Sequence, residues 1–143
     1  MPVTHQDFPG KESKLPIEAQ YDQLPTEDGG YQKYKSASKL KGKRAIITGG
    51  DSGIGRATSL LFAHEDADVF IVYLPDEEDD AQETKKLVEA AGGKCHLLAT
   101  DLTKQENCQK VVDEAVKAMG GIDILFNNAA YQMMVDDIKD LSE

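Results

Sequence analysis

Three closely spaced glycines give the sequence its clearest chemical signal. The stretch Thr48-Gly-Gly-Asp-Ser-Gly-Ile-Gly-Arg56 follows a short apolar block and places glycines at positions 49, 53 and 55. Glycine lets the chain leave a strand sharply, lets a diphosphate approach the backbone, and lets the next helix pack closely. The amides at the start of that helix would face the phosphates. The spacing therefore predicts a phosphate-binding loop, although glycines in such a turn also occur for structural reasons alone.

Two further polar positions follow later apolar blocks. Asp101 and Leu102 come after the block at 96–99, and Asn127-Asn128-Ala129-Ala130 comes after the block at 122–126. Taken alone, Asp101 fits a helix cap beside Thr103, and the asparagines fit a turn. Both structural alternatives stay open at this point.

Strand-length apolar blocks alternate with helical periodicity between residues 45 and 126. Strands are expected at 45–48, 69–73, 96–99 and 122–126, and helices at 54–65, 79–91 and 103–119. Thr103 and Glu106 form a capping-box pattern at the start of the third helix. Right-handed crossovers turn this β-α-β-α-β-α-β order into a parallel sheet covered on both faces. The predicted fold class is α/β, the N-terminal half of a Rossmann-like, doubly wound parallel sheet.

Residues 1–42 differ in composition from the rest of the chain. Four of the five prolines lie in the first 25 residues among polar side chains, which indicates a disordered, polar tail. Residues 43–143 form the expected domain, and the helix start at 140–143 indicates that the sheet is truncated at its C-terminal end. The strand at 122–126 would then be an unpaired edge, so the chain alone is expected to fold poorly or to need a partner.

The overall charge and hydropathy pattern exclude several classes of partner. The 143 residues include 16 basic and 26 acidic side chains, a formal net charge of −10. This field repels nucleic acid and anionic membranes. No window reaches the about 18 to 20 apolar residues of a membrane span, and the first ten residues lack the basic-then-apolar order of a secretion signal, so cytoplasm is expected. Cys95 and Cys108 have no metal-ligand spacing; both are expected to be reduced and buried, and no metal site is predicted.

Together the motifs resemble those of the short-chain dehydrogenase/reductase family. Its glycine motif is Thr-Gly-x-x-x-Gly-x-Gly, and its fourth strand ends in Asn-Asn-Ala-Gly. Residues 48–55 match the first motif fully, and 127–129 match the second, with Ala130 in place of glycine. The polar extension and the string ITGGDSGIGRA resemble a subgroup of bacterial and fungal stress-type oxidoreductases. The resemblance implies an NAD(P)-dependent oxidoreductase that acts on an alcohol or carbonyl and is a homo-oligomer when full length.

The resemblance also implies which residues contact the nicotinamide dinucleotide. The glycine loop would line the phosphates, Asp101 would accept from the adenine amino group, and Asn128 and Ala129 would border the adenosine ribose. The complete predicted set is Gly49, Asp51, Ser52, Gly53, Ile54, Gly55, Tyr73, Asp101, Leu102, Asn128 and Ala129.

The choice between NAD and NADP depends on the end of the second strand. A carboxylate about 20 residues past the glycines binds a free ribose 2′-hydroxyl and repels a 2′-phosphate. Tyr73 occupies this place, so NADP is favoured, with Ser52 and Tyr73 as hydroxyl contacts, although no basic partner for the phosphate stands in 73–76. The acidic run 76–80 is interpreted as a solvated helix start.

No residue is assigned a catalytic role. In the resembled family a Tyr, a Lys four residues later and a Ser act on the carbonyl, all downstream of the fourth strand. Here Tyr131 and Lys139 are eight positions apart, more than two helical turns, and Ser142 follows. Tyr31 and Lys35 have the right spacing but precede the first strand, so the match is interpreted as coincidence. A non-catalytic nucleotide-binding or regulatory fragment and a nonfunctional truncated product remain the alternatives.

Overall fold

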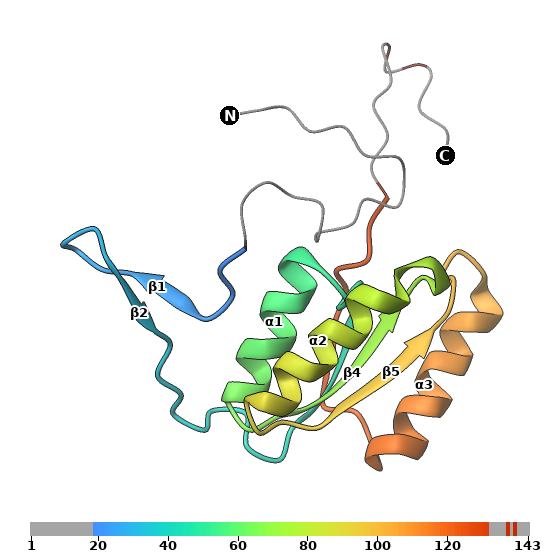
Figure 1. Cartoon of the computed structure of the whole chain (residues 1–143). Helices are drawn as coiled ribbons and strands as arrows, with labels where there is room; N and C mark the ends of the chain where they lie inside the picture. The colour runs from blue at the N-terminus through green and yellow to red at the C-terminus, as the bar shows by residue number, and fades with distance from the viewer. Residues whose placement is uncertain (1–18, 132–136, 138, 140–143) are drawn as a thin grey trace.

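Four parallel strands form the sheet in the computed structural model, which describes residues 19–131, 137 and 139 (Figure 1). Along the chain they are β3 (Arg44–Thr48), β4 (Asp68–Tyr73), β5 (Cys95–Ala99) and β6 (Ile124–Phe126). Their order across the sheet is β5-β4-β3-β6. Each predicted strand is present, with bounds that differ by at most two residues. The predicted α/β half of a doubly wound sheet is therefore confirmed.

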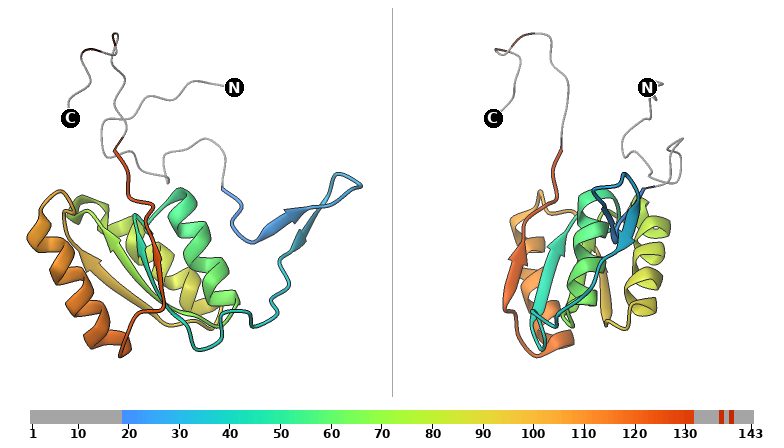
Figure 2. Two further views of the ribbon diagram at one scale, coloured as in Figure 1. Left: turned by 180° about the vertical axis from the view of Figure 1, so that it is seen from behind. Right: turned by 90° about the vertical axis from the view of Figure 1, so that its left-hand side faces the viewer.

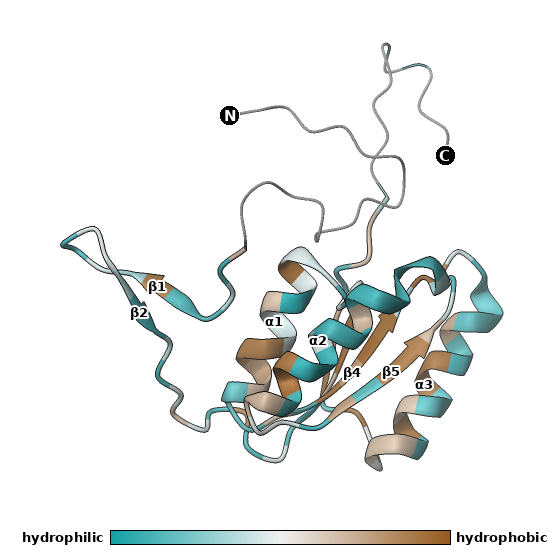
Figure 3. Cartoon of the chain, in the orientation of Figure 1, coloured by the Kyte–Doolittle hydropathy of each residue, from teal (hydrophilic) through white to brown (hydrophobic). Residues whose placement is uncertain are grey.

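Helices cover both faces of this sheet, as the edge view in Figure 2 shows. The helices are α1 (Gly53–His64), α2 (Glu78–Ala90), which follows a short 3₁₀ turn, η2 (Pro75–Glu77), and α3 (Gln105–Met119). Alternate strand residues face opposite layers: Ile47 and Ile71 pack with α1 and α2, whereas Ile46 and Val72 pack with α3. Figure 3 shows a hydrophobic β4 behind α2, whose outer surface is largely hydrophilic, whereas α1 is more hydrophobic.

The strand order creates a switch point between β3 and β6. From β3 the chain steps through β4 to β5 in one direction, and α3 then carries it back across the sheet to β6 on the other side of β3. The loops after β3 and β6 therefore leave the sheet from adjacent strands. Ligands of doubly wound sheets bind at such a switch point, outside the carboxyl ends of the strands.

The predicted capping box at the start of the third helix is wrong. The helix begins at Gln105, and its N-cap residue, Lys104, makes no capping hydrogen bond through its side chain. Thr103 instead turns back: its backbone amide and its hydroxyl both donate to Oδ1 of Asp101, at 2.9 and 2.8 Å. An acceptor two residues upstream forms a local turn that competes with the cap for the same side chain.

A β-hairpin stands in the segment that the sequence assigned to the polar tail. Strands β1 (Gln23–Pro25) and β2 (Tyr31–Lys33) pair antiparallel and project from the body (Figure 1). The turn uses Gly29 at φ +81°, and the amide of Thr26 donates to the carbonyl of Gly30. Strands of three exposed residues carry no hydropathy signal, so this element was not predicted. The expectation for residues 1–18 lies outside the described residues.

The two cysteines differ in environment. Cys95 is buried beneath α1 and α2, as expected, but Cys108 is exposed, so the prediction that both are buried is wrong. Cys108 lies in the first turn of α3, where its thiol contacts the carbonyls of Leu102 and Lys104 rather than the sheet. Within the described ranges, no cluster of His, Cys, Asp or Glu could hold a metal ion. In the same part of the chain no helix has the length and apolar character to span a membrane.

Candidate functional site

A cavity of about 730 Å³ lies at the carboxyl ends of β3, β4 and β6, beside the switch point. Its size is in the range of small-molecule sites. It is lined by every predicted site residue except Gly55, namely Gly49, Asp51, Ser52, Gly53, Ile54, Tyr73, Asp101, Leu102, Asn128 and Ala129. The fold thus brings together residues that are spread over 80 positions of the sequence.

The three motif glycines differ in backbone conformation and in the space around them. Gly49 and Gly53 have φ values of +61° and +51°, which side chains other than glycine rarely adopt. A Cβ on Gly53 would meet no atom within 4 Å, so this position opens onto the cavity. A Cβ on Gly55 would stand 1.9 Å from the carbonyl oxygen of Gly49. Gly55 therefore lets α1 approach β3, while Gly53 leaves room for a ligand.

The N-terminus of α1 lies at this cavity. Its N-cap residue, Ser52, has extended backbone and makes no side-chain hydrogen bond to the helix amides. No acidic residue stands in the first turn. Ser52, Gly53 and Ile54 all line the cavity. The positive end of the helix dipole and the amides of its first turn suit an anionic group such as a phosphate.

Hydrogen bonds between Asn128 and Thr48 join the loop after β6 to the loop after β3. The side-chain amide of Asn128 donates to the carbonyls of Thr48 and Gly49, at 3.1 and 2.9 Å. The hydroxyl of Thr48 in turn accepts from the backbone amides of Asn128 and Ala129, at 2.9 and 3.0 Å. Asn128 therefore fixes the glycine loop from across the switch point, in addition to lining the cavity beside Ala129. Thr48 was not in the predicted set, although it opens the glycine motif.

Asp101 lines the cavity and also stabilises a turn. Its Oδ1 accepts from Thr103, and its carbonyl oxygen accepts from Nδ2 of Asn107 at 2.7 Å. The backbone amide of Thr103, followed by its hydroxyl, lowers the pKa of the Asp101 carboxyl below its usual value. Asp101 is thus anionic at neutral pH and is held in place beside Leu102 on the cavity wall. Asp101 therefore forms a turn with Thr103 rather than a helix cap, because the N-cap residue of α3 is Lys104, and it also lines the cavity.

Carboxylates surround the buried Tyr73 at the end of β4. Its hydroxyl donates to Oε2 of Glu78 at 2.6 Å, and burial, followed by that contact, raises the pKa of Tyr73. Burial, followed by the charge of Asp51, raises the pKa of Glu77, which lines the cavity. Burial raises the pKa of Asp51.

The interpretation of 76–80 as a solvated helix start is therefore only partly correct. Asp76, Glu78 and Asp79 are exposed, but Glu77 is half-buried on the cavity wall and Asp80 is buried.

The Tyr and Lys residues considered for a catalytic pair lie in different places. Tyr31 is exposed on the projecting hairpin, whereas Tyr131 lines the cavity. Lys139 pairs with Asp137 through Nζ and Oδ2 at 2.8 Å. Ser142 lies outside the described residues. Besides Thr48, the predicted set lacks Glu77 and Arg56. Glu77 lines the cavity but belongs to the acidic run that was interpreted as solvated. Arg56 ends the glycine motif and is buried beneath the loop.

The comparison with protein families agrees with these features of the site. They are the cavity at the switch point, the glycine loop and the hydrogen bonds between Thr48 and Asn128, here called the Thr48–Asn128 clasp. The model described as short chain dehydrogenase matches residues 43–143. The chain belongs to this family. The resemblance drawn from the glycine and asparagine motifs is confirmed, and with it the class of oxidoreductases.

Individual relatives agree with this assignment. General stress protein 39 of Bacillus subtilis (strain 168) is 52% identical over 126 residues, which cover 88% of this chain and 43% of that protein. A short chain dehydrogenase from Burkholderia cenocepacia J2315 in complex with NADP has 36% identity and a TM-score of 0.66, over 73% of this chain and 42% of that one. A short chain dehydrogenase from Mycobacterium paratuberculosis bound to NAD has 37% identity and a TM-score of 0.60, over 66% and 39%.

This short-chain dehydrogenase spans less than half the length of the curated relatives it matches. The part that matches contains the glycine loop and both loops of the switch point. The similarity to General stress protein 39 supports the stress-type subgroup that the polar extension and the string ITGGDSGIGRA indicated.

Proposed function

We propose that this chain binds a nicotinamide dinucleotide in the switch-point cavity. The observation that carries the proposal is the N-terminus of α1, which lies at a cavity of about 730 Å³. Its N-cap residue, Ser52, makes no side-chain hydrogen bond to the helix, and a Cβ on Gly53 would meet no atom within 4 Å. A diphosphate fits this end because its charge meets backbone amides and the helix dipole. The adenine half would extend toward Asp101 and Leu102, and the ribose would border Asn128 and Ala129.

We infer that the function of the whole protein is hydride transfer between the dinucleotide and an alcohol or carbonyl. The nicotinamide ring carries the hydride when it is bound. The residues of this chain bind and orient the cofactor: the glycine loop holds the diphosphate, and the Thr48–Asn128 clasp keeps the loop in position. The proposal rests on membership of the short-chain dehydrogenase family and on the bound cofactors of two solved members.

NADP is the proposed form of the dinucleotide. Support comes from Tyr73, which occupies the strand end where a carboxylate would bind the 2′-hydroxyl of NAD. Two carboxylates disfavour the binding of NADP, because Asp51 and Glu77 both line the cavity and would repel a 2′-phosphate. Glu77→Gln removes one of these charges. It should therefore strengthen binding of NADPH relative to NADH, and an unchanged ratio would place Glu77 away from the phosphate.

The central test is a fluorescence titration of the full chain with NADPH and with NADH. Gly53→Val places a side chain in the open space at the helix start and should weaken binding by at least about tenfold. Gly92→Val is the matched control: Gly92 has φ +91° and also meets no atom within 4 Å, but it follows α2 near the opposite edge of the sheet. Both variants therefore place valine at a positive φ, but only Gly53→Val changes the cavity.

Three outcomes are informative. A loss of affinity in Gly53→Val alone supports the site. Equal losses in both variants would attribute the effect to backbone strain. A wild-type chain that melts cooperatively and binds neither dinucleotide would refute the proposed function.

A further inference from the structure

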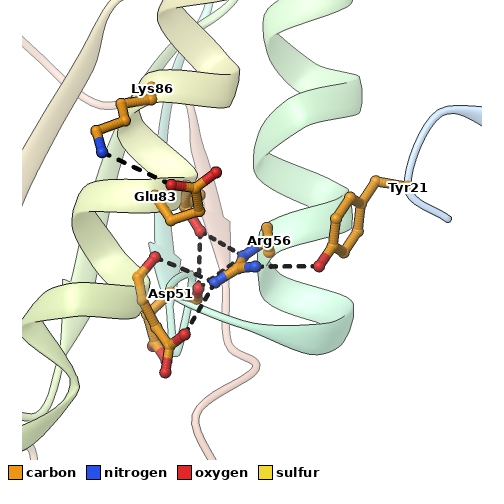
Figure 4. A network of polar contacts seen from close by, with 7 residues as sticks. Tyr21, Asp51, Arg56, Glu83 and Lys86 are labelled. Carbon is orange, nitrogen blue, oxygen red and sulfur yellow. Dashed lines mark hydrogen bonds and ion pairs between the residues drawn. The ribbon is translucent and has the colours of Figure 1, made fainter. Parts of the chain in front are cut away.

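Arg56 is a buried cation whose contacts come from three segments of the chain, namely the glycine loop, α2 and the N-terminal extension (Figure 4). It lies in the first turns of α1, directly after the glycine motif. Its guanidinium donates to the carbonyl of Asp51, the hydroxyl of Thr84, the carbonyl and carboxylate of Asp80, and the hydroxyl of Tyr21. Such a set of contacts uses the planar, forked geometry of arginine, which lysine does not have.

The first of these contacts fixes the backbone of the glycine loop. The carbonyl of Asp51 accepts from Nε of Arg56 at 2.9 Å and from the hydroxyl of Thr84 at 2.7 Å. Because a trans peptide is planar, the amide of Ser52 must point opposite to that carbonyl, away from the guanidinium. Ser52 lines the cavity. Arg56 and Thr84 together therefore hold the peptide that carries the Ser52 amide, at the phosphate end of the proposed site.

Tyr21 holds Arg56 from outside the domain. Its hydroxyl accepts from Nη1 of Arg56 at 3.0 Å, and the guanidinium carbon lies 5.6 Å from the centre of its ring. A hydrogen bond to a charged group and a cation–π contact both stabilise this arrangement. Tyr21 belongs to the N-terminal extension, 35 positions before Arg56. A segment that precedes the sheet thus reaches the network that orients the loop.

A second anchor ties the same extension to the far end of α1. Glu65, at the C-terminal end of this helix, accepts from the hydroxyl of Tyr34 and from the backbone amides of Ala37 and Lys39, at 3.1 and 2.7 Å for the amides. The helix has 12 residues and is therefore about 18 Å long. One anchor of the extension contacts the network at the loop, and the other lies a helix length away from it.

We propose that Tyr21 is a positioning residue for the cofactor site: through Arg56 it holds the Asp51–Ser52 peptide in the geometry that receives the diphosphate. The N-terminal extension then contributes to dinucleotide affinity, although none of its residues from 19 onward lines the cavity. This inference rests on the proposed function, because its effect is measured as affinity for the dinucleotide.

Two matched substitutions test the proposal in the full chain. Tyr21→Phe removes the hydroxyl that faces Arg56, and Tyr34→Phe removes the hydroxyl that faces Glu65. Both variants keep the ring and lose a hydroxyl contact between the extension and α1. Tyr34→Phe also removes the acceptor for Nζ of Lys39, which lies 3.2 Å from the Tyr34 hydroxyl. The measurements are the Kd for NADPH and NADH, the melting temperature, and the hydrogen-exchange rates of the amides at 52–54.

Tyr21→Phe should raise the Kd about threefold to tenfold and speed amide exchange at 52–54. Tyr34→Phe should lower the melting temperature but leave the Kd and those exchange rates unchanged within about twofold. A purely structural role of Tyr21 would instead make the two variants alike, and that result would overturn the proposal. An unchanged Kd in Tyr21→Phe would also overturn it.

The amide-exchange measurement separates this inference from the proposed function. If the wild-type chain binds neither dinucleotide, the proposed function fails, and exchange at 52–54 in the free chain still decides the role of Tyr21. Faster exchange in Tyr21→Phe alone would support the link through Arg56. Equal exchange rates in wild type, Tyr21→Phe and Tyr34→Phe would overturn it.

Discussion

Replacing Gly55 by alanine tests how closely α1 must approach β3. The new Cβ would stand 1.9 Å from the carbonyl oxygen of Gly49, 2.7 Å from its carbon and 2.8 Å from Nδ2 of Asn128. Non-bonded carbon contacts are favourable only beyond about 3.5 Å. The helix or the loop must therefore move by roughly 1.5 Å to accept one methyl group.

The free-energy cost of that movement can be assembled from the contacts it breaks. The amide of Asn128 would lose its hydrogen bonds to Thr48 and Gly49, about 1 kcal/mol each. Overpacking adds about 1 to 3 kcal/mol. The free energy of unfolding should thus fall by about 3 to 5 kcal/mol. Gly53→Ala is the control, because its Cβ meets nothing and only its φ of +51° costs about 1 to 2 kcal/mol, partly offset by lower unfolded-state entropy.

The assay is urea unfolding followed by circular dichroism for wild type, Gly53→Ala and Gly55→Ala. Gly55→Ala should shift the midpoint far more than Gly53→Ala, with the same slope if the transition stays two-state. If its stability is too low for a native baseline, a melt at low temperature in a stabilising osmolyte supplies the comparison. A loss of less than about 1 kcal/mol in Gly55→Ala would refute the close packing described for this position.

Three further outcomes are expected. The Tyr34 hydroxyl and nearby backbone amides lower the pKa of Glu65 from 4.5 to about 2, so its stabilising effect is complete above pH 4.5 and is lost as the pH falls toward 2. Glu65→Gln should accordingly lower the melting temperature at pH 7 but by less near pH 2, and a pH-independent difference would contradict this. A thiol reagent should modify Cys108 in the native chain but not Cys95, whose pKa burial raises to about 12, and rapid modification of both would contradict the described packing. Leu125, 57% exposed on β6, lies at the edge of the described sheet, so Leu125→Lys should reduce self-association in light scattering, and undiminished association would locate the contact elsewhere.

The sheet and the glycine loop were predictable because their signals are local. Each strand of the parallel sheet is a short, largely apolar run, and its alternation with helical segments specifies a parallel sheet. The glycine spacing reflects demands within a single turn, as the contacts of Gly53 and Gly55 show. The residues that line the cavity follow from these two features, since strand ends in such a sheet converge at one edge.

The extension was not predictable in the same way. Its anchors join residues that are 31 and 35 positions apart, Tyr34 with Glu65 and Tyr21 with Arg56. Such pairs leave no periodic pattern, and a segment rich in proline and polar residues satisfies the usual criteria for a tail. The capping box failed for a related reason: Thr103 had a second acceptor, Asp101, that the pattern does not include.

The polar network beneath the loop follows from the periodicity of α2 rather than from a motif. Positions 77, 80, 81, 84 and 88 recur at helical spacing, so they share one face of the chain between η2 and the end of α2. Ala81 and Val88 bury this face against the sheet, and Asp80 and Thr84 are therefore buried with them. A buried carboxylate is stable only beside a cation or several donors. Arg56 on the neighbouring helix supplies that charge at 3.3 Å, and its remaining donors reach the loop and the extension. The apolar stripe of α2 thus requires a buried cation at the position where the glycine motif ends.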